Sequence, residues 1–361
     1  MKNISVVLFS GGTGGHVIPA VNFGNYLIDH GYKCLLFLDK RGIQYASKFR
    51  GKVVKINSAH FSGNIFFISK SILFLLHGLV QSIYYLFLIR PSHCIAFGSY
   101  ASFMPLTVAI ILRILRITII HLHEQNSIIG KVNLFFLPFS KNLFLNLNDI
   151  KNLHPRFAKK MCHVGLPNDG KIAFKKRRIE INKEKKIKIF IYGGSQGSIN
   201  LNTGFIKLIK KLPDNFLKNL SVIFQSPNNQ IPIIESELKN FGINYELKNF
   251  FDDIYKVLNS SDIVVSRSGA GAINNIIISQ IPSILVPLPH SVYNHQYANA
   301  KYLFDKNAAQ LIEEKHLNFN TAYFKFKELI ENIDKRIMLI KNLQSIKILD
   351  ANDLMIKKIF E

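Results

Sequence analysis

Near its start the chain reads ISVVLFSGGTGGHVIPA (residues 4–20), an apolar β-branched run followed by a glycine-rich turn and a segment that can begin a helix. A strand, a turn and a helix in this order form the first unit of an open parallel sheet. Glycines let backbone N–H groups approach an anion at the positive end of the following helix. The stretch therefore predicts an α/β fold with a phosphate-binding loop at Gly11–Gly15.

The same pattern returns in the second half of the chain. Residues 187–197 read IKIFIYGGSQG, so another apolar run meets another glycine loop. Short apolar runs alternate with helical patterns after both loops, which predicts two Rossmann-like parallel-sheet domains. We expect strands at Ile4–Phe9, Cys34–Leu38, Val53–Ile56, Cys94–Phe97, Thr118–Leu122, Ile187–Tyr192, Ser221–Phe224, Ile263–Val265 and Ser283–Val286.

The length of the chain suits two domains. It has 361 residues, of which 48% are hydrophobic, enough for two sizeable cores. We expect one domain at 1–163, a second at 164–340, and a C-terminal helix at 341–361 that packs back towards the first domain. The densely charged residues 171–188 (KIAFKKRRIEINKEKKIK) are interpreted as a solvated surface loop near this boundary.

The formal net charge is +23, which calls for an anionic partner such as nucleic acid, a phosphorylated substrate or an acidic membrane surface. A coding bias towards lysine would raise the charge without a function. Because no aromatic residues interleave with the basic clusters, nucleic acid is not expected as a partner. The three cysteines lack a C-x-x-C spacing and indicate a reduced, cytoplasmic protein.

One segment is long and apolar enough to be tested as a membrane span. Ser71–Ile89 (SILFLLHGLVQSIYYLFLI) carries no formal charge. Gly78, Gln81, Ser82 and Tyr85 nevertheless form a weak polar stripe at helical spacing. The strands expected on either side belong to one sheet, which a spanning helix would divide. We therefore favour a partly exposed or membrane-dipping helix, with a buried core helix as the alternative.

Polar residues follow the predicted strands of the first half. His16 lies just after the first glycine loop, at a helix start, where the helix dipole favours the neutral base form. The run HEQN (residues 123–126) closes another strand, and Glu124 is a base, an orienting group or a structural carboxylate. Asp39 would bind a nicotinamide ribose in a dehydrogenase, but a solvated turn is the favoured interpretation.

Two further loops carry polar groups in the second half. SRSGAGA (residues 266–272) follows a predicted strand and opens a helix, which predicts another anion- or sugar-binding turn. After the stiff PLPH (residues 287–290), Gln296 and Asn299 share one helix face and offer amides that suit sugar hydroxyls. The chain contains no D-x-D sequence, so we expect no metal, with backbone amides and helix dipoles meeting any diphosphate charge.

Taken in order along nearly the whole chain, GGTGGHVIPA, HEQN, GGSQG, SRSGAGA and PLPH…NHQYANA resemble the MurG family of bacterial glycosyltransferases. The resemblance implies a GT-B fold, in which two domains face one cleft, and inversion at the anomeric carbon without metal or cofactor. It implies transfer of GlcNAc from UDP-GlcNAc to the C4 hydroxyl of the muramyl sugar of undecaprenyl-pyrophosphoryl-MurNAc-pentapeptide, for peptidoglycan. The N-terminal domain would face the acceptor, at the cytoplasmic face of the inner membrane, to which the protein would attach peripherally.

The resemblance also implies roles for individual residues. His16 is the candidate base for the acceptor hydroxyl, with Glu124 as the alternative. On the donor side, Gln296 would hold the GlcNAc hydroxyls and Phe251 would present its backbone to uracil. The first glycine loop would lie near the acceptor pyrophosphate. The other expected substrate-binding residues are Thr13, Gly14, Gly15 and Asn126, which would line the cleft, and Ser195, Gln196, Ala270, Gly271, Ala272, Asn275 and Asn299 on the donor side.

Three positions depart from the family pattern. Asn275 replaces the usual Glu that grips the ribose, Asp169 stands where the family's G-N-P-V-R has Arg, and Ser99 stands where G-G-Y is usual. We expect these changes to affect donor affinity more than reaction type. A UDP-GlcNAc 2-epimerase of the same architecture, an NAD-dependent dehydrogenase and a non-enzymatic membrane scaffold remain alternatives.

Overall fold

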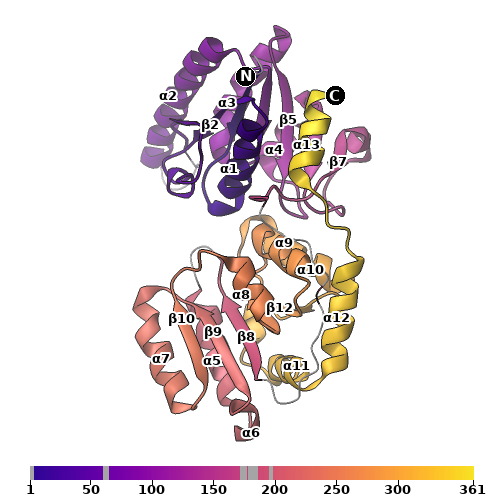
Figure 1. Cartoon of the computed structure of the whole chain (residues 1–361). Coiled ribbons are helices and arrows are strands. Elements are labelled where there is room, and N and C mark those ends of the chain that lie inside the picture. Colours follow the sequence, from indigo (N-terminus) through magenta and orange to yellow (C-terminus); the bar gives the residue numbers. More distant parts are fainter. Residues whose placement is uncertain (1–3, 60–64, 171–176, 178–185, 195–197) are drawn as a thin grey trace. The chain divides into compact units, whose positions relative to one another are not determined.

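The computed structural model describes residues 4–59, 65–170, 177, 186–194 and 198–361, and it divides into two compact units (Figure 1). The N-terminal unit comprises Met1–Ile172 and Leu349–Glu361, and the C-terminal unit comprises Ala173–Ile348. The divisions at 172/173 and 348/349 lie several residues beyond those expected at 163/164 and 340/341. Most of the charged segment 171–188 lies outside the described residues.

The N-terminal unit is built on seven parallel strands in the order β3-β2-β1-β4-β5-β6-β7. Its strands β1 to β4 are Ser5–Phe9, Lys33–Leu38, Lys52–Lys55 and His93–Ala96, and β5 to β7 are Ile119–Glu124, Asn142–Leu145 and Met161–His163. Its helices are α1 (Gly14–Asp29), α2 (Ile65–Ile89), α3 (Phe103–Ile114), α4 (Lys131–Phe136) and α13 (Ala351–Phe360).

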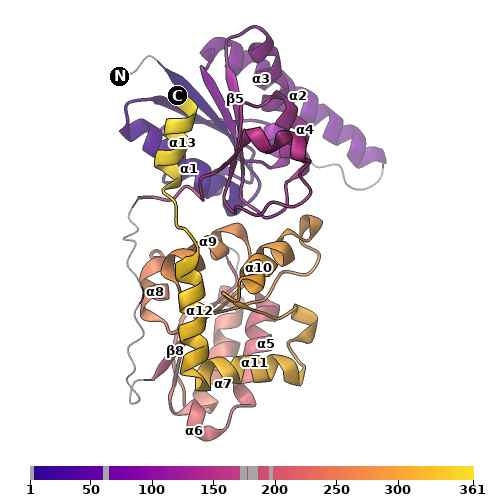
Figure 2. The ribbon, with the colours of Figure 1, turned by 90° about the vertical axis from the view of Figure 1, so that its right-hand side faces the viewer.

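Helices cover both faces of this sheet, as expected for a parallel sheet whose strands are apolar on both sides. In Figure 2, α1 and α13 lie on one face and α2, α3 and α4 on the other. The C-terminal helix α13 returns to the N-terminal unit, where Met355 and Ile359 join the core beside α1. Its terminal Phe360 stacks on Tyr32 with ring centroids 4.2 Å apart.

The C-terminal unit repeats the architecture with six parallel strands in the order β10-β9-β8-β11-β12-β13. The strands are β8 (Ile187–Tyr192), β9 (Leu220–Gln225), β10 (Asn244–Lys248), β11 (Ile263–Ser266), β12 (Ser283–Leu285) and β13 (Gln310–Leu311). The helices are α5 (Ile199–Lys210), α6 (Asp214–Leu217), α7 (Ile231–Asn240), α8 (Ile254–Ser260), α9 (Ala270–Ser279), α10 (His295–Asp305), α11 (Asn320–Glu331) and α12 (Ile333–Ser345).

The predicted α/β class and the nine predicted strands are confirmed, with ends shifted by no more than one or two residues. Four strands were not predicted: β6, β7, β10 and β13. The last two have partly exposed residues and little apolar character, and β6 and β7 are only a few residues long. Short strands of this kind are held by their neighbours in the sheet rather than by their own sequence pattern.

Helix α2 exposes its apolar side chains, whereas an ordinary surface helix buries them. Most of its long apolar side chains point outward, and only 17% of the apolar stretch within Ser71–Ile89 is buried, so the interpretation as a buried core helix is wrong. The polar stripe faces the protein instead: Ser82 is fully buried, and Gln81 Oε1 accepts a hydrogen bond from the Asn57 N–H at 2.8 Å. A Cβ at Gly78 would clash with the backbone oxygen of Asn57, so glycine lets the helix approach here.

By length and composition, Ser71–Ile89 is the one helix among the described residues that qualifies to cross a membrane. The strands before and after it, β3 and β4, nevertheless belong to the same sheet. A helix that spanned a bilayer would place these strands on opposite sides of it. The topology therefore fits a helix that lies on the surface of the N-terminal unit.

Candidate active site

The first glycine loop joins β1 to α1 at the carboxyl edge of the N-terminal sheet. Thr13 is the residue before the helix, is exposed, and makes no side-chain hydrogen bond to the helix N–H groups. Gly14 is buried and Gly15 is exposed in the first turn, which contains no acidic residue. This helix start can therefore receive an anion, because no side chain caps it and its first turn holds no acidic residue.

Asp39 lies underneath this loop and is only 3% exposed, so the expectation of a solvated turn is wrong. Its Oδ1 atom accepts hydrogen bonds from the Gly12 N–H at 2.8 Å and the Gly42 N–H at 2.9 Å. Its Oδ2 atom pairs with Arg41 at 3.1 Å. Both carboxylate oxygens thus hold protein groups, and the buried carboxylate shapes the loop instead of presenting itself to a ribose.

His16 is fixed in one tautomer by two carbonyl groups. Its Nδ1 atom lies 2.9 Å from the backbone oxygen of Phe97 and 2.8 Å from the side-chain oxygen of Gln125. The Gln125 amide nitrogen donates to Phe97 and His123 oxygens, which leaves its oxygen as the acceptor. Since both partners accept, Nδ1 carries the hydrogen, and the Nε2 atom of neutral His16 carries the lone pair.

Glu124, at the end of β5, is buried and fully engaged. Its Oε1 atom accepts the Asn126 N–H at 3.1 Å, and its Oε2 atom accepts the Gly130 N–H at 2.9 Å and the Asn133 side-chain amide at 2.9 Å. The carboxylate therefore organises the turn between β5 and α4 and orients Asn126. Sequence reasoning did not single out Asn133, although a lone amide within the apolar KVNLFF helix was a usable signal.

In the C-terminal unit, the predicted binding loops lie where the strands end. Ser195 and Gln196 lie outside the described residues. Gly269 precedes α9, which begins with Ala270, Gly271 and Ala272, and this helix start has no side-chain cap and no acidic residue. Among the residues that the structure describes, none would come within 4 Å of a Cβ at Gly269 or Gly271, so they leave the backbone open there. The open backbone suits the close approach of a bulky anion.

Two residues were expected to contact the nucleoside, Asn275 on α9 and Phe251 just before α8. The Tyr255 hydroxyl donates to the Asn275 side-chain oxygen at 2.8 Å, so the amide nitrogen is the donor that Asn275 retains. Phe251 is 9% exposed and packs edge-on against Phe190 with centroids 5.4 Å apart. With its ring in the core, Phe251 has only its backbone to offer a ligand.

Gln296 and Asn299 differ in their surroundings although they share a face of α10. The Gln296 side-chain oxygen accepts a hydrogen bond from the Leu288 N–H at 3.0 Å, so the amide nitrogen points away from Leu288. Asn299 is fully buried, and its amide nitrogen donates to the Ser268 oxygen at 3.1 Å. In this structure Asn299 braces the Ser266–Ala272 turn, whereas Gln296 is half-buried.

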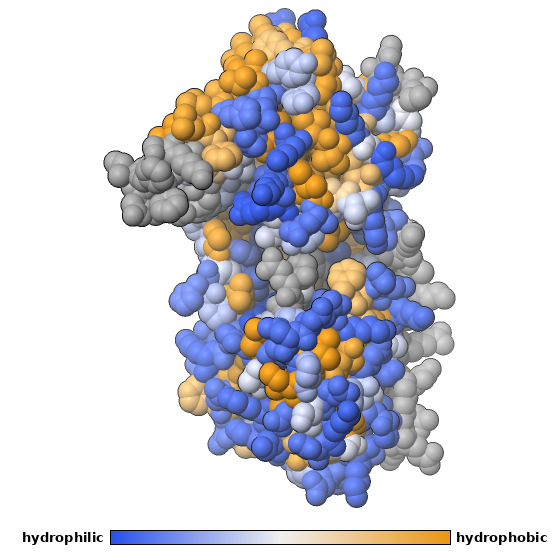
Figure 3. All heavy atoms as spheres, turned by 90° about the vertical axis from the view of Figure 1, so that its left-hand side faces the viewer, coloured by the Kyte–Doolittle hydropathy of each residue, from blue (hydrophilic) through white to orange (hydrophobic). Residues whose placement is uncertain are grey.

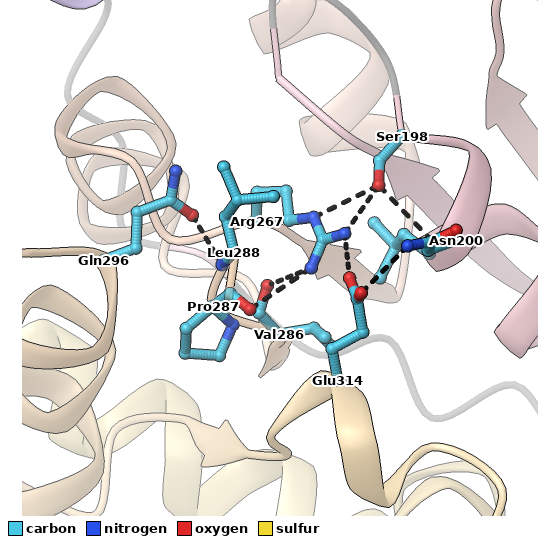
Figure 4. A network of polar contacts seen from close by, with 9 residues as sticks. Ser198, Asn200, Arg267, Val286, Pro287, Leu288, Gln296 and Glu314 are labelled. Atoms are coloured by element: carbon cyan, nitrogen blue, oxygen red, sulfur yellow. Dashed lines mark hydrogen bonds and ion pairs between the residues drawn. The ribbon is translucent and has the colours of Figure 1, made fainter. Parts of the chain in front are cut away.

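A buried arginine, to which the sequence analysis gave no role, lies below these loops (Figure 4). Arg267 is 4% exposed and directly follows β11. Its guanidinium group donates to the Ser198 hydroxyl and to the backbone oxygens of Val286 and Pro287, and it pairs with Glu314. The motif SRSGAGA pointed to the turn, but only the tertiary structure shows what its arginine holds.

Comparisons with known proteins agree with this architecture. Residues 6–145 match the glycosyltransferase family 28 N-terminal domain, and residues 188–354 match the C-terminal domain of the same family. A crystal structure of Acinetobacter baumannii MurG has the same fold, with a TM-score of 0.78 and 20% identity over 99% of each chain.

Two curated relatives are named UDP-N-acetylglucosamine–N-acetylmuramyl-(pentapeptide) pyrophosphoryl-undecaprenol N-acetylglucosamine transferase. The protein of Rickettsia canadensis is 35% identical over 91% of each chain. That of Anaplasma marginale is 33% identical over 88% of this chain and 87% of its own. This chain belongs to the MurG transferase family.

Membership of the MurG family confirms the resemblance and the GT-B fold class, and neither relative is named as an epimerase or a dehydrogenase. The family departures occupy distinct places in the structure. Ser99 adopts φ 74° and ψ 149°, a region normally reserved for glycine. Asp169 is exposed in the segment before the C-terminal unit, and Asn275 lies on α9 against Tyr255.

Proposed function

We propose that this protein transfers GlcNAc from UDP-GlcNAc to the C4 hydroxyl of the muramyl sugar of undecaprenyl-pyrophosphoryl-MurNAc-pentapeptide. The names of the curated relatives support the reaction. The structural observation that carries it is His16, whose Nδ1 atom is held by two carbonyl oxygens so that Nε2 is the basic atom. A base in the correct tautomer is what a hydroxyl nucleophile requires.

In the proposed reaction His16 Nε2 takes the proton from the C4 hydroxyl as that oxygen attacks C1 of GlcNAc. The new bond joins the acceptor oxygen to C1, and the bond from C1 to the diphosphate oxygen breaks on the opposite face. The configuration at C1 is therefore inverted, and the bonding electrons leave with UDP. The proton remains on the imidazole, whose positive charge the carbonyl oxygens at Phe97 and Gln125 stabilise.

Glu124 is proposed as a positioning residue rather than the base. Its two oxygens already accept hydrogen bonds from Asn126, Gly130 and Asn133. Removing a proton from substrate would break this arrangement. We assign Thr13, Gly14, Gly15 and Asn126 to the acceptor, since they surround the uncapped start of α1 and the turn that Glu124 holds.

For the donor, the start of α9 at Ala270, Gly271 and Ala272 is proposed to face the diphosphate, because its N–H groups and dipole stabilise the charge that develops as UDP leaves. Gln296 would donate its amide to a GlcNAc oxygen. Asn275 would donate to the ribose, and the backbone at Phe251 would read uracil. Ser195 and Gln196, which follow β8 in the sequence, complete the proposed donor set.

Membrane attachment is proposed through the apolar face of the N-terminal unit, which is orange in Figure 3. Exposed apolar side chains on α2 are joined by others on α3 and α4, and exposed Arg113, Arg116 and Lys131 lie among them. Such a surface would insert apolar groups among lipid tails while its cations meet anionic headgroups. The apolar side chains are Ile72, Leu73, Phe74, Leu76, Val80, Ile83, Tyr84, Phe87, Leu88, Ile111, Ile114, Leu115, Leu134 and Phe135.

This face would place the protein peripherally at the inner membrane, on the side where UDP-GlcNAc is available, the cytoplasm. The reaction is tested with labelled UDP-GlcNAc and a short-chain lipid acceptor. We expect label in the lipid fraction and free UDP in equal amount. Release of the label as free GlcNAc or ManNAc, with none in lipid, would contradict the proposed transfer.

A further inference from the structure

The guanidinium group of Arg267 joins segments that follow four neighbouring strands. Ser198 caps α5 after β8, and Arg267 itself follows β11. Val286 and Pro287 follow β12, and Glu314 follows β13. Strands β8, β11, β12 and β13 are adjacent and parallel, so all four segments leave the same edge of the sheet. Ligands of open α/β sheets bind at that edge.

Each nitrogen of the guanidinium group has a partner. Nη1 donates to the Val286 and Pro287 oxygens, both at 3.2 Å, and Nε donates to the Ser198 hydroxyl at 3.2 Å. Nη2 donates to the same hydroxyl at 2.7 Å and pairs with a Glu314 oxygen. The other Glu314 oxygen accepts a hydrogen bond from the Asn200 side-chain amide at 3.0 Å. The start of α5 is therefore linked to this network through Asn200 as well as through Ser198.

These links lead directly to the proposed donor contacts. Ser198 ends the glycine loop after β8, and Arg267 precedes the turn that opens α9. Next to Pro287, the Leu288 N–H holds the Gln296 side chain. A shift of Arg267 would therefore be passed to Ser198 and to Val286 and Pro287 through hydrogen bonds, and to the turn that opens α9 through the chain itself.

We propose that Arg267 is a positioning residue for the nucleotide-sugar site. It does not touch the donor, but it fixes the positions of the donor-binding loops relative to one another. The inference rests on the proposed function and extends it to a residue with no assigned role. A planar fork with fixed donor directions suits the task, whereas a lysine ammonium cannot reach four separated acceptors. Displacing a binding loop by about 1 Å costs up to roughly a hundredfold in rate.

The chain offers a matched control in Arg177. This residue is half-buried in the C-terminal unit, where burial lowers the pKa of its guanidinium group. It donates to backbone oxygens of Leu258, Ser261 and Ser279. Ser261 precedes β11 and Ser279 ends α9, so Arg177 braces the opposite edge of the sheet from Arg267. Loss of its fork should cost stability without moving the donor loops.

The test compares Arg267→Lys with Arg177→Lys in the full chain. UDP affinity is measured by calorimetry well below the unfolding midpoint, and KM and kcat are measured for each substrate. We expect Arg267→Lys to raise the Kd for UDP and the KM for UDP-GlcNAc by about tenfold or more, with the acceptor KM unchanged. Arg177→Lys should lower the unfolding midpoint and leave the Kd for UDP within about twofold.

An unchanged Kd for UDP in folded Arg267→Lys would overturn the inference and leave the proposed function intact, as would an equal loss of affinity in Arg177→Lys. Should Arg267→Lys fail to fold, Ser198→Ala removes one acceptor of the fork, and we expect a rise in Kd of about threefold at unchanged acceptor KM. If the wild-type protein did not bind UDP, the proposed donor site would be wrong, and so would the proposed function.

Discussion

The Nδ1 atom of His16 lies 2.8 Å from the side-chain oxygen of Gln125, on the β5–α4 turn, although the two residues are far apart in sequence. The Phe97 oxygen lies 2.9 Å from the same atom. Gly98, two residues after β4, lies against the imidazole and has a φ of 77°, a backbone conformation that favours glycine. The ring is therefore oriented by three segments of the N-terminal sheet.

His16→Gln should remove the proton acceptor and lower kcat by about a hundredfold to ten-thousandfold. UDP binding should be unchanged, because His16 belongs to the N-terminal unit. The matched control is His30→Gln, at the other end of the same helix, whose Nδ1 atom bonds the Tyr26 oxygen at 2.8 Å. The measurement is kcat at steady state with saturating donor. A His16→Gln enzyme with the wild-type kcat would exclude the histidine as the base.

Ser99→Gly should stabilise the protein by about 1 kcal/mol, because Ser99 holds a backbone conformation that costs a non-glycine residue about 1–3 kcal/mol. Part of the gain is offset by the larger backbone entropy of glycine in the unfolded chain. Ser99→Ala is the control, since it keeps the strain and removes only the hydroxyl, which accepts the Ala101 N–H at 3.4 Å. Denaturant unfolding of both variants should separate them; equal stabilities would show that the strain is absent.

Leu73→Gln and Leu88→Gln should each weaken binding to anionic vesicles by about tenfold, the effect of withdrawing one large apolar side chain from lipid. These side chains are 67% and 68% exposed, so the unfolding midpoint should not change. Phe324→Gln provides the control, because Phe324 is 63% exposed on α11 of the C-terminal unit. Flotation with vesicles gives the measurement. Equal loss of binding in all three variants would argue against a defined apolar face.

The N-terminal unit should lose stability in mild acid. Burial of the fully enclosed His123 ring lowers its pKa to about 4, and neighbouring His16 acts in the same direction. Since the folded pKa lies below the unfolded value of about 6.5, protonation favours unfolding, and the stability present above that pH is lost as pH falls towards 4. By pH 5 the loss amounts to roughly 2 kcal/mol.

His123→Gln cannot take up this proton, so its unfolding free energy should change less than the wild-type value between pH 7.5 and pH 5. Burial also lowers the pKa of His93 and His121, which lie 3.3 Å apart between nitrogens, and they add to the slope with the same sign. The variant should therefore flatten the profile without abolishing it. Identical pH profiles for the two proteins would show that His123 does not titrate on unfolding.

Local sequence patterns sufficed for much of the fold because each one acts over a few residues. The apolar run before Gly11 and the one before Gly193 predicted β1 and β8, since strand, glycine turn and helix start are contiguous in the chain. The helix over Ser71–Ile89 was also predicted from its own composition. The side of this helix that faces the protein was not predicted, because it depends on the hydrogen bond that the Asn57 N–H donates to Gln81.

For the site, the sequence by itself determined the family motifs, the two glycine loops and the candidate histidine, because these depend on neighbouring residues. The tertiary structure alone decided how the groups are used. In the folded structure Asp39 is buried and accepts a hydrogen bond from the Gly12 N–H. Phe97 and Gln125 determine the tautomer of His16, and the ends of four strands meet around Arg267. Hydrogen-bond partners distant in sequence meet only when the sheet forms, and no local pattern records which acceptor a donor will find.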